Sequence, residues 1–262
     1  FPYTTLFRSG ASALLVSLFW LSAQSVPQFV AARAHSFVAG QQAKTALVIG
    51  GSGVFGSLLV GELSREGYRV LATASSNESA QRIPTTADLR LLLDLEDEAS
   101  IATLANYLVA SEPLDLVVVA SGRVGFGSAL ETNREQSERL MQINYRGPAE
   151  LLAKMSPALN PSAQLAVITG IVASRSFPGM SSYCASKAAL SGWLSAVRQE
   201  WRRDGIAILE AQPGHTETGL AGRPLFGSPP PMPAGMQPDA VVARILSAIK
   251  EKATLLTAED FA

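Results

Sequence analysis

The chain has 262 residues, of which 47% are hydrophobic and 16% are charged, and its formal net charge is -1. These values predict one or two globular domains with a sizeable core, and the balanced charge argues against a nucleic-acid-binding surface. Cys184 is the single cysteine and there are two histidines, so we expect no intrachain disulfide and no metal site. Cys184, set among small residues, is interpreted as a helix-packing residue.

The N-terminal segment differs in character from the rest of the chain. Residues 1–9 resemble a translated sequencing-library adapter, and an apolar run from Leu14 to Leu21 follows that is too short to span a bilayer. This run fits a signal peptide, an acid-poor transit peptide or translated upstream sequence equally well. We predict that residues 1–43 lie outside the folded domain, which comprises residues 44–262. We expect a cytoplasmic protein, or a targeted or exported one if residues 10–40 are a genuine targeting segment.

From Lys44 onward, short apolar runs alternate with segments of helical periodicity. Strands are expected at 45–49, 69–74, 89–93, 114–120, 165–168, 206–211 and 254–256. Helices are expected at 54–65, 101–109, 134–155, 182–203 and 238–252, and 222–238 is expected to be a loop or lid. Continuous apolar strands separated by helices are typical of a parallel sheet buried on both faces. The predicted fold class is therefore α/β, with a single doubly wound, Rossmann-type parallel sheet of six to seven strands and helices on both faces.

A glycine-rich turn follows the first predicted strand. Glycines at positions 50, 53 and 56 fit a tight strand-to-helix turn, where a phosphate can approach the backbone and the helix N-terminus. An ordinary glycine-rich turn is the alternative. The predicted phosphate-binding residues are Gly50, Ser52, Gly53, Val54, Phe55 and Gly56.

The end of the second strand bears on the choice of nicotinamide cofactor. An acidic residue there accepts from a ribose hydroxyl and repels a 2′-phosphate, but this chain has Ser75 and Ser76 and no acid. The sequence therefore favours NADP(H) over NAD(H), although no arginine stands at this point. After the third strand, Asp94 and Leu95 are predicted to contact adenine, and a helix-capping role for the Asp94 carboxylate is the alternative.

Tyr183 and Lys187 lie four residues apart and therefore on one face of a predicted helix. A tyrosine ionises near pH ~10, and a nearby positive charge lowers that pKa. The pair is interpreted as a candidate acid–base centre in which Lys187 lowers the pKa of Tyr183.

With these motifs in this order, the chain from about Lys44 to at least Leu220 resembles the short-chain dehydrogenases/reductases, as an atypical member. The resemblance rests on the glycine turn, Asp94, the segment 144–147, the Tyr183–Lys187 pair and the segment 213–218. It implies the strand order 3-2-1-4-5-6-7. It also implies proton transfer by Tyr183, binding of the nicotinamide ribose by Lys187 and a proton relay through Asn144. Cofactor contacts are implied for Ala120, Gly122, Pro213, Gly214, Thr216 and Thr218.

Three positions depart from the family pattern. The glycine usually found at Val54 is shifted to Gly53, and two asparagines after the fourth strand are missing. The family's serine, thirteen positions before the tyrosine, is replaced by Gly170. Removing one such hydrogen-bond donor typically costs ~10²–10³ in rate. The neighbouring Thr169 is the predicted substitute, brought into place by a one-residue slip of the loop.

The predicted function is an NAD(P)(H)-dependent oxidoreductase that interconverts a carbonyl and an alcohol. The alternative is a catalytically weakened dinucleotide-binding regulator or scaffold. Apolar residues near 171–182 and 220–232 favour an apolar small-molecule substrate. Alanines on the two long helices, together with the family resemblance, predict a homodimer or homotetramer.

Overall fold

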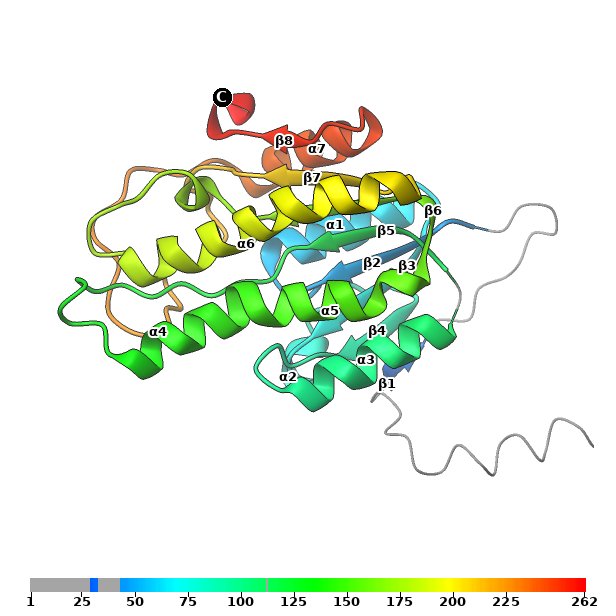
Figure 1. The fold of residues 1–262 in the computed structure, drawn as a ribbon, viewed down its shortest axis with the longest axis horizontal. Coiled ribbons are helices and arrows are strands. Elements are labelled where there is room, and N and C mark those ends of the chain that lie inside the picture. The colour runs from blue at the N-terminus through cyan, green and yellow to red at the C-terminus, as the bar shows by residue number, and fades with distance from the viewer. Residues whose placement is uncertain (1–28, 33–42, 112) are drawn as a thin grey trace, which may run out of the picture.

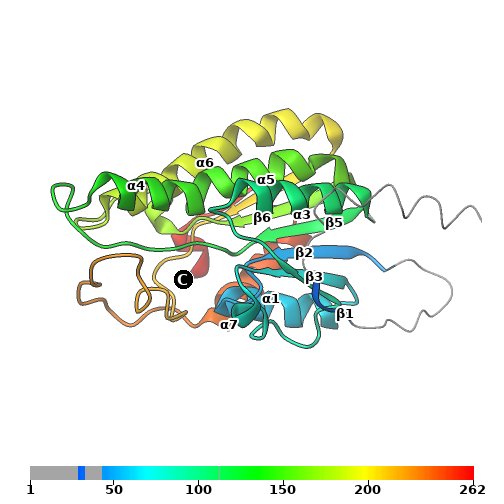
Figure 2. The ribbon, with the colours of Figure 1, turned by 90° about the horizontal axis from the view of Figure 1, so that it is seen from below.

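The computed structural model describes residues 29–32, 43–111 and 113–262, in which helices cover both faces of one sheet (Figures 1 and 2). The sheet order is β1-β4-β3-β2-β5-β6-β7-β8, and every neighbouring pair from β4 to β8 is parallel. Counted from the first parallel strand, this is the predicted order 3-2-1-4-5-6-7, which is confirmed. The strands are β1 Phe29–Ala32, β2 Thr45–Ile49, β3 Arg69–Ala74, β4 Leu89–Leu92, β5 Leu114–Val119, β6 Leu159–Ile168, β7 Ala207–Ala211 and β8 Leu255–Leu256.

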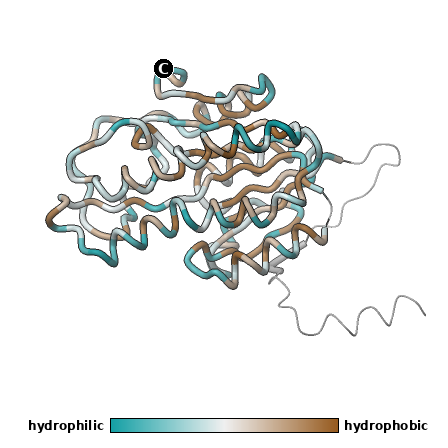
Figure 3. Tube along the Cα trace, viewed as in Figure 1, coloured by the Kyte–Doolittle hydropathy of each residue, from teal (hydrophilic) through white to brown (hydrophobic). Residues whose placement is uncertain are grey.

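The helices form two layers, with α3, α5 and α6 on one face and α1 and α7 on the other (Figure 2). Each layer buries an apolar stripe against the sheet, so an apolar core lies on each face, and the strands appear as brown bands in Figure 3. None of the described helices is long and apolar enough to cross a membrane. The helices are α1 Val54–Arg65, α2 Asn77–Ala80, α3 Glu98–Ala110, α4 Arg134–Met141, α5 Gly147–Met155, α6 Ser181–Trp201 and α7 Pro238–Lys250.

The connectivity reverses at the centre of the sheet. From β2 the chain winds outward through β3 to β4, and it then returns to β5 on the other side of β2. The loops that leave β2 and β5 therefore diverge at the carboxyl edge, where open α/β sheets bind their ligands. Topology alone places a binding crevice there.

One strand lies before the predicted domain boundary. Residues Phe29–Ala32 form β1, which pairs antiparallel with β4 at the edge of the sheet. This strand lies within residues 1–43, which were predicted to lie outside the folded domain, and the boundary at residue 44 stays a prediction. Antiparallel pairing with an edge strand depends on a contact more than fifty residues away in the chain, which local periodicity does not reveal. The other predictions for the N-terminal segment fall outside the described residues.

The helix predicted at 134–155 is present over this whole range, but it is not α-helical throughout. A π-helical turn, η1 (Gln142–Arg146), lies between α4 and α5 and carries Asn144. Such turns widen the helix by one residue and occur frequently at functional sites. The apolar spacing runs through this turn without a visible break, so the sequence pattern missed it.

Candidate functional site

A cavity of about 1010 Å³ runs along the carboxyl edge of the sheet. The glycine turn after β2 and the segment between β7 and α7 both line it. Most of the predicted site residues line this cavity, namely Gly50, Ser52, Gly53, Val54, Phe55, Ser75, Asp94, Leu95, Ala120, Gly122, Thr169, Tyr183, Lys187, Pro213, Gly214, Thr216 and Thr218. The remaining three, Gly56, Ser76 and Asn144, do not.

The glycine turn is held by close backbone packing. Gly50 has a φ of +88°, and a Cβ there would lie 2.9 Å from the backbone nitrogen of Ser121. A Cβ on Gly56 would lie 2.1 Å from the carbonyl oxygen of Gly50, well inside van der Waals contact. Gly56 therefore shapes the turn instead of lining the cavity. At Gly53, the residue before α1, the nearest atom to a Cβ is 3.5 Å away, so the backbone is open at the helix N-terminus.

At the end of β3, the two predicted serines have different environments. Ser75 is exposed to the cavity, but Ser76 caps the short helix α2, and its hydroxyl accepts from the Ser79 backbone at 3.1 Å. The capping box occupies Ser76, so its predicted contact with a phosphate is not supported. Helix α2 also turns the chain back, so that Arg82 lines the same part of the cavity. The sequence reasoning missed Arg82 because a four-residue helix has no readable period.

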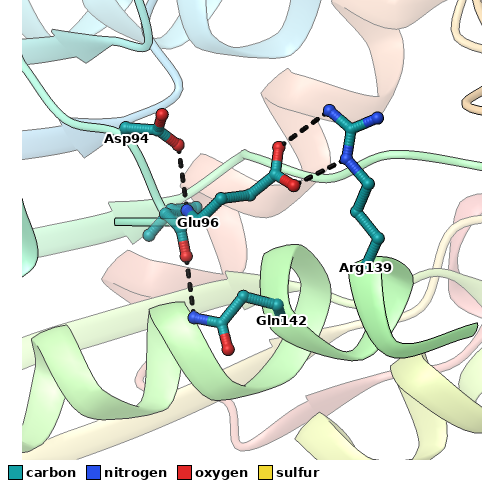
Figure 4. Close-up of polar contacts among 5 residues, drawn as sticks. Asp94, Glu96, Arg139 and Gln142 are labelled. Carbon is teal, nitrogen blue, oxygen red and sulfur yellow. Dashed lines mark hydrogen bonds and ion pairs between the residues drawn. The ribbon is translucent and has the colours of Figure 1, made fainter. Parts of the chain in front are cut away.

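The loop after β4 is tied to the helix that carries Asn144. Figure 4 shows Glu96 and Arg139 facing each other in a two-point ion pair, with N–O distances of 2.6 and 3.0 Å. Gln142 Nε2 donates to the carbonyl of Leu95 at 3.0 Å. Asp94 Oδ1 accepts from the Glu96 backbone at 2.9 Å (Figure 4), and the N-cap of α3 is Asp97. The capping alternative for Asp94 is therefore excluded.

Tyr183 and Lys187 lie one turn apart near the start of α6, and both line the cavity. Tyr183 is 8% exposed and Lys187 is 4% exposed. The Lys187 ammonium donates to the carbonyl of Ile168 at 3.3 Å, and a Cβ on Gly122 would lie 2.9 Å from Nζ. A glycine at 122 therefore leaves the room that the ammonium occupies.

Burial dominates the titration of both groups. Desolvation raises the pKa of Tyr183 above its ordinary value, with a smaller contribution from Cys184, and Lys187 does not offset it. Burial therefore outweighs any lowering of the Tyr183 pKa by Lys187 in the protein by itself, and that role of Lys187 stays a prediction. Tyr183 keeps its proton through neutral pH, which suits a proton donor.

Burial lowers the pKa of Lys187 to about 8. The unfolded lysine, with its pKa near ~10.4, binds more protons than the folded one between about pH 8 and 10.5, so stability rises with pH across that window. Replacing Lys187 by Met removes this buried charge, and we expect unfolding at pH 7 to become harder by about 1–3 kcal/mol. Urea unfolding at pH 7 and pH 10 measures this, and a variant less stable than the parent at pH 7 would contradict the assignment.

Asn144 holds a backbone segment of the cavity wall. Its Oδ1 accepts from the Arg123 backbone nitrogen at 2.8 Å, and its Nδ2 donates to the Arg123 carbonyl at 2.8 Å and to Ser186 Oγ at 3.0 Å. Both amide protons are thereby used, and Ser186 Oγ donates in turn to the carbonyl of Tyr183 at 2.7 Å. Asn144 therefore connects the segment after β5 with α6, and its role in a proton relay stays a prediction.

Thr169 does not take the place of the missing serine. Its hydroxyl donates to the buried carboxylate of Glu210 at 2.8 Å, and Glu210 also accepts from Gln212 Nε2 at 2.8 Å. The backbone does not slip, because Thr169 and Gly170 both donate to the carbonyl of Ala211. The Thr169 prediction is corrected. Gly170 has a φ of +85°, a conformation that serine adopts at a cost.

The residues fit a dinucleotide in two respects. The open backbone of the glycine turn offers amide groups at the N-terminus of α1, as a pyrophosphate requires. Ser121 Oγ lines the same cavity, is buried, and has no hydrogen-bond partner among the described residues. In the part of the chain that the structure describes, no cluster of His, Cys, Asp and Glu could hold a metal ion.

Comparison with known proteins agrees with this geometry. The family model described as short chain dehydrogenase matches residues 44–224. The cyclic-di-GMP-binding biofilm dispersal mediator protein of Escherichia coli (strain K12) is 30% identical over 177 residues, covering 67% of this chain and 74% of that protein. The uncharacterized oxidoreductase YbbO of the same strain is 29% identical over 180 residues, covering 67% of this chain. The chain spans 66% of the length of YbbO, just under two thirds.

A solved structure extends the likeness to three dimensions. The crystal structure of BdcA in complex with NADPH superposes with a TM-score of 0.70 at 26% identity. The match covers 82% of this chain and 92% of that chain.

Proposed function

The chain belongs to the short-chain dehydrogenase/reductase family, and from this premise we propose that it is an NADP(H)-dependent oxidoreductase that interconverts a carbonyl and an alcohol. The observation that carries the proposal is the buried pair Tyr183 and Lys187 on the wall of a cavity that begins at a glycine turn. NADPH, when bound, supplies the hydride. The chain's own residues orient the substrate, exclude water and supply the proton.

Tyr183 is the proposed proton donor to the carbonyl oxygen. Burial raises its pKa, so the phenol is protonated at the pH at which reduction runs. Lys187, with its pKa lowered to about 8, changes charge close to neutral pH and is the group best placed on α6 to replenish that proton. Asn144 links the Arg123 backbone to Ser186 on α6, so these two parts of the cavity wall stay fixed relative to each other.

The preference for NADP(H) over NAD(H) rests on the charge at the end of β3. Ser75, Ser79 and Arg82 line the cavity there, and no carboxylate follows the strand directly. A guanidinium and hydroxyl groups suit a 2′-phosphate, which an acidic residue would repel. The solved relative in complex with NADPH supports the same preference.

Replacing Arg82 by Gln tests this preference. We expect the Kd for NADPH to rise about 10- to 100-fold, because a charge-assisted contact is worth about 1.5–3 kcal/mol. The Kd for NADH should change little, since NADH carries no 2′-phosphate. Fluorescence titration with both cofactors measures the ratio, and Arg203→Gln, at an exposed position after α6, is the control. An unchanged NADPH to NADH ratio would show that Arg82 does not read the phosphate.

The direct test of the proposed function is NADPH oxidation against a panel of ketones and aldehydes. The apolar lining favours substrates with an apolar body, with contributions from Ile171, Val172, Phe177, Met180, Leu220 and Met232. Turnover of at least one compound, lost in the Tyr183→Phe variant, is the expected result. Tight NADPH binding with no turnover across the panel would overturn it.

A second candidate function is a dinucleotide-binding regulator. Gly170 removes the hydroxyl that clamps the substrate oxygen in the family, and the 30% identical relative is named for binding cyclic-di-GMP. This candidate predicts nucleotide binding without turnover. Equilibrium binding of cyclic-di-GMP, measured beside the NADPH oxidation panel, separates the two functions.

A further inference from the structure

Besides Arg82, three arginines line the cavity. Arg123 follows Gly122 after β5, Arg175 follows the short helix η3 (Ile171–Ala173), and Arg223 belongs to the segment between β7 and α7. All three are exposed to solvent. The family motifs do not include these positions, and the predicted apolar substrate gives them no role.

The backbone holds two of these arginines together. Leu225 donates to the carbonyl of Val124 at 2.8 Å, and Phe126 donates to the carbonyl of Phe226 at 3.0 Å. The Phe226 ring lies so close to Gly125 that a Cβ there would be 2.4 Å from it. These contacts bring residues a hundred positions apart side by side.

Arg123 and Arg223 meet at this paired segment. Arg123 Nη2 donates to the carbonyl of Arg223 at 3.5 Å, and Arg223 itself donates to the carbonyls of Gly219 and Thr218 at 3.2 and 3.3 Å. Both guanidinium groups are thereby anchored by neutral carbonyl oxygens. Their charges face the cavity without being neutralised by these contacts.

Among the described residues, none of the three arginines forms an ion pair with a carboxylate. Arg175 lies over the ring of Phe177 at 5.4 Å from its centroid. Glu217 also lines the cavity, but it accepts from the Gly235 backbone and lies 3.7 Å from His215 Nε2. Glu96, which also lines the cavity, pairs with Arg139. Positive charges that line one cavity without a carboxylate partner favour a bound anion.

We propose that the substrate carries an anionic group, a carboxylate or a phosphate, which Arg123 and Arg223 bind, with Arg175 on the cavity rim. The inference rests on the proposed function and names the substrate class of that site. Guanidinium groups bind both anions through paired N–H donors. Apolar residues such as Val172 and Leu220 line the same cavity as Tyr183 and the arginines, so the substrate has a carbonyl, an apolar body and an anionic end.

Matched aldehydes test the proposal in the full-length protein with NADPH. The neutral probe is 4-formylbenzamide, and its anionic counterparts are 4-carboxybenzaldehyde and 4-formylphenyl phosphate. We expect kcat/KM for an anionic aldehyde to exceed that for the amide by about 10- to 100-fold, as expected for a charge-assisted contact. The advantage should shrink as salt is raised. The anion with the larger advantage identifies carboxylate or phosphate as the preferred group.

The arginine variants locate the effect. Arg223→Gln and Arg123→Gln should each lower the anionic-to-neutral ratio about 10-fold. The Asn144 contacts to residue 123 involve its backbone and persist in the variant. Arg203→Gln removes an exposed arginine outside the cavity and should keep the parent ratio. A ratio near one in the parent protein, or an unchanged ratio in both cavity variants, overturns the proposal.

A failed proposal and a failed function give different results. Turnover of the amide with no anion advantage rejects the anion site and keeps the oxidoreductase. If no aldehyde reacts, the oxidoreductase proposal fails for this panel, and the anion site is judged by binding. The NADPH-loaded protein should then be stabilised more by 4-carboxybenzaldehyde than by the amide in thermal unfolding, and Arg223→Gln should remove the difference. Equal stabilisation rejects the site.

Discussion

Replacing Tyr183 by Phe is expected to reduce kcat for carbonyl reduction by about 10²–10⁴-fold, the usual contribution of a positioned proton donor. Burial keeps the Tyr183 phenol protonated, and the variant loses that proton without changing the shape of the side chain. The hydroxyl makes no hydrogen bond with another described residue, so folding and NADPH affinity should stay near the parent values. Stopped-flow or steady-state NADPH oxidation, with a parallel binding titration, measures both quantities.

Tyr145→Phe is the matched control for this experiment. Tyr145 lies on the π-helical turn next to Asn144, packs against the core of the α3–α5–α6 layer and does not line the cavity. The same loss of a phenolic hydroxyl should leave kcat within a few-fold of the parent. If Tyr183→Phe retained turnover comparable to Tyr145→Phe, the proton would come from another group.

A Gly56→Ala variant is expected to lose most of its NADPH affinity and about 1–3 kcal/mol of stability, the usual cost of overpacking. The added Cβ would lie 2.1 Å from the Gly50 carbonyl oxygen and 2.7 Å from the Gly51 Cα. Both of these are backbone atoms, so the turn must open to relieve the contact. Opening the turn displaces the amide groups at the start of α1 that are proposed to bind phosphate. Fluorescence titration with NADPH and urea unfolding measure the two effects.

Gly61→Ala offers the opposite outcome on the same helix. The nearest atom to a Cβ at Gly61 is Arg65 Nη2 at 3.7 Å, so the methyl group fits. Alanine in a helix interior is favoured over glycine by about 0.8–1 kcal/mol, and the control should be more stable than the parent with unchanged NADPH binding. If Gly56→Ala kept the NADPH affinity of Gly61→Ala, NADPH binding would not depend on the backbone geometry of the turn.

The glycine turn also shows how far residue spacing predicts a site. Glycines at 50, 53 and 56 were sufficient to place the turn, but not to separate their roles. Gly50 has a positive φ, Gly53 leaves the helix N-terminus open and Gly56 packs against backbone. These differences depend on which backbone atoms lie opposite each glycine.

Thr169 shows where sequence distance misleads. It stands next to Gly170, and a slip of one residue would bring its hydroxyl toward the substrate. The structure instead directs that hydroxyl to Glu210 on the neighbouring strand β7. A buried carboxylate needs hydrogen-bond donors, and Thr169 and Gln212 supply them. This contact between Thr169 and Glu210 becomes apparent only when β6 is paired with β7.

The order of the strands came from the family resemblance, while the sequence by itself determined the parallel sheet, the phosphate-type turn and the placement of Tyr183 and Lys187 on one helix face. Each of these follows from periodicity or spacing within about twenty residues, where local geometry fixes which side chains share a face. Tertiary structure alone decided the edge strand β1, the place of Arg82 and the meeting of Arg123 with Arg223. These contacts join segments that are far apart in the chain, and no periodic pattern of residues reveals them. They form only when the sheet and its loops pack together.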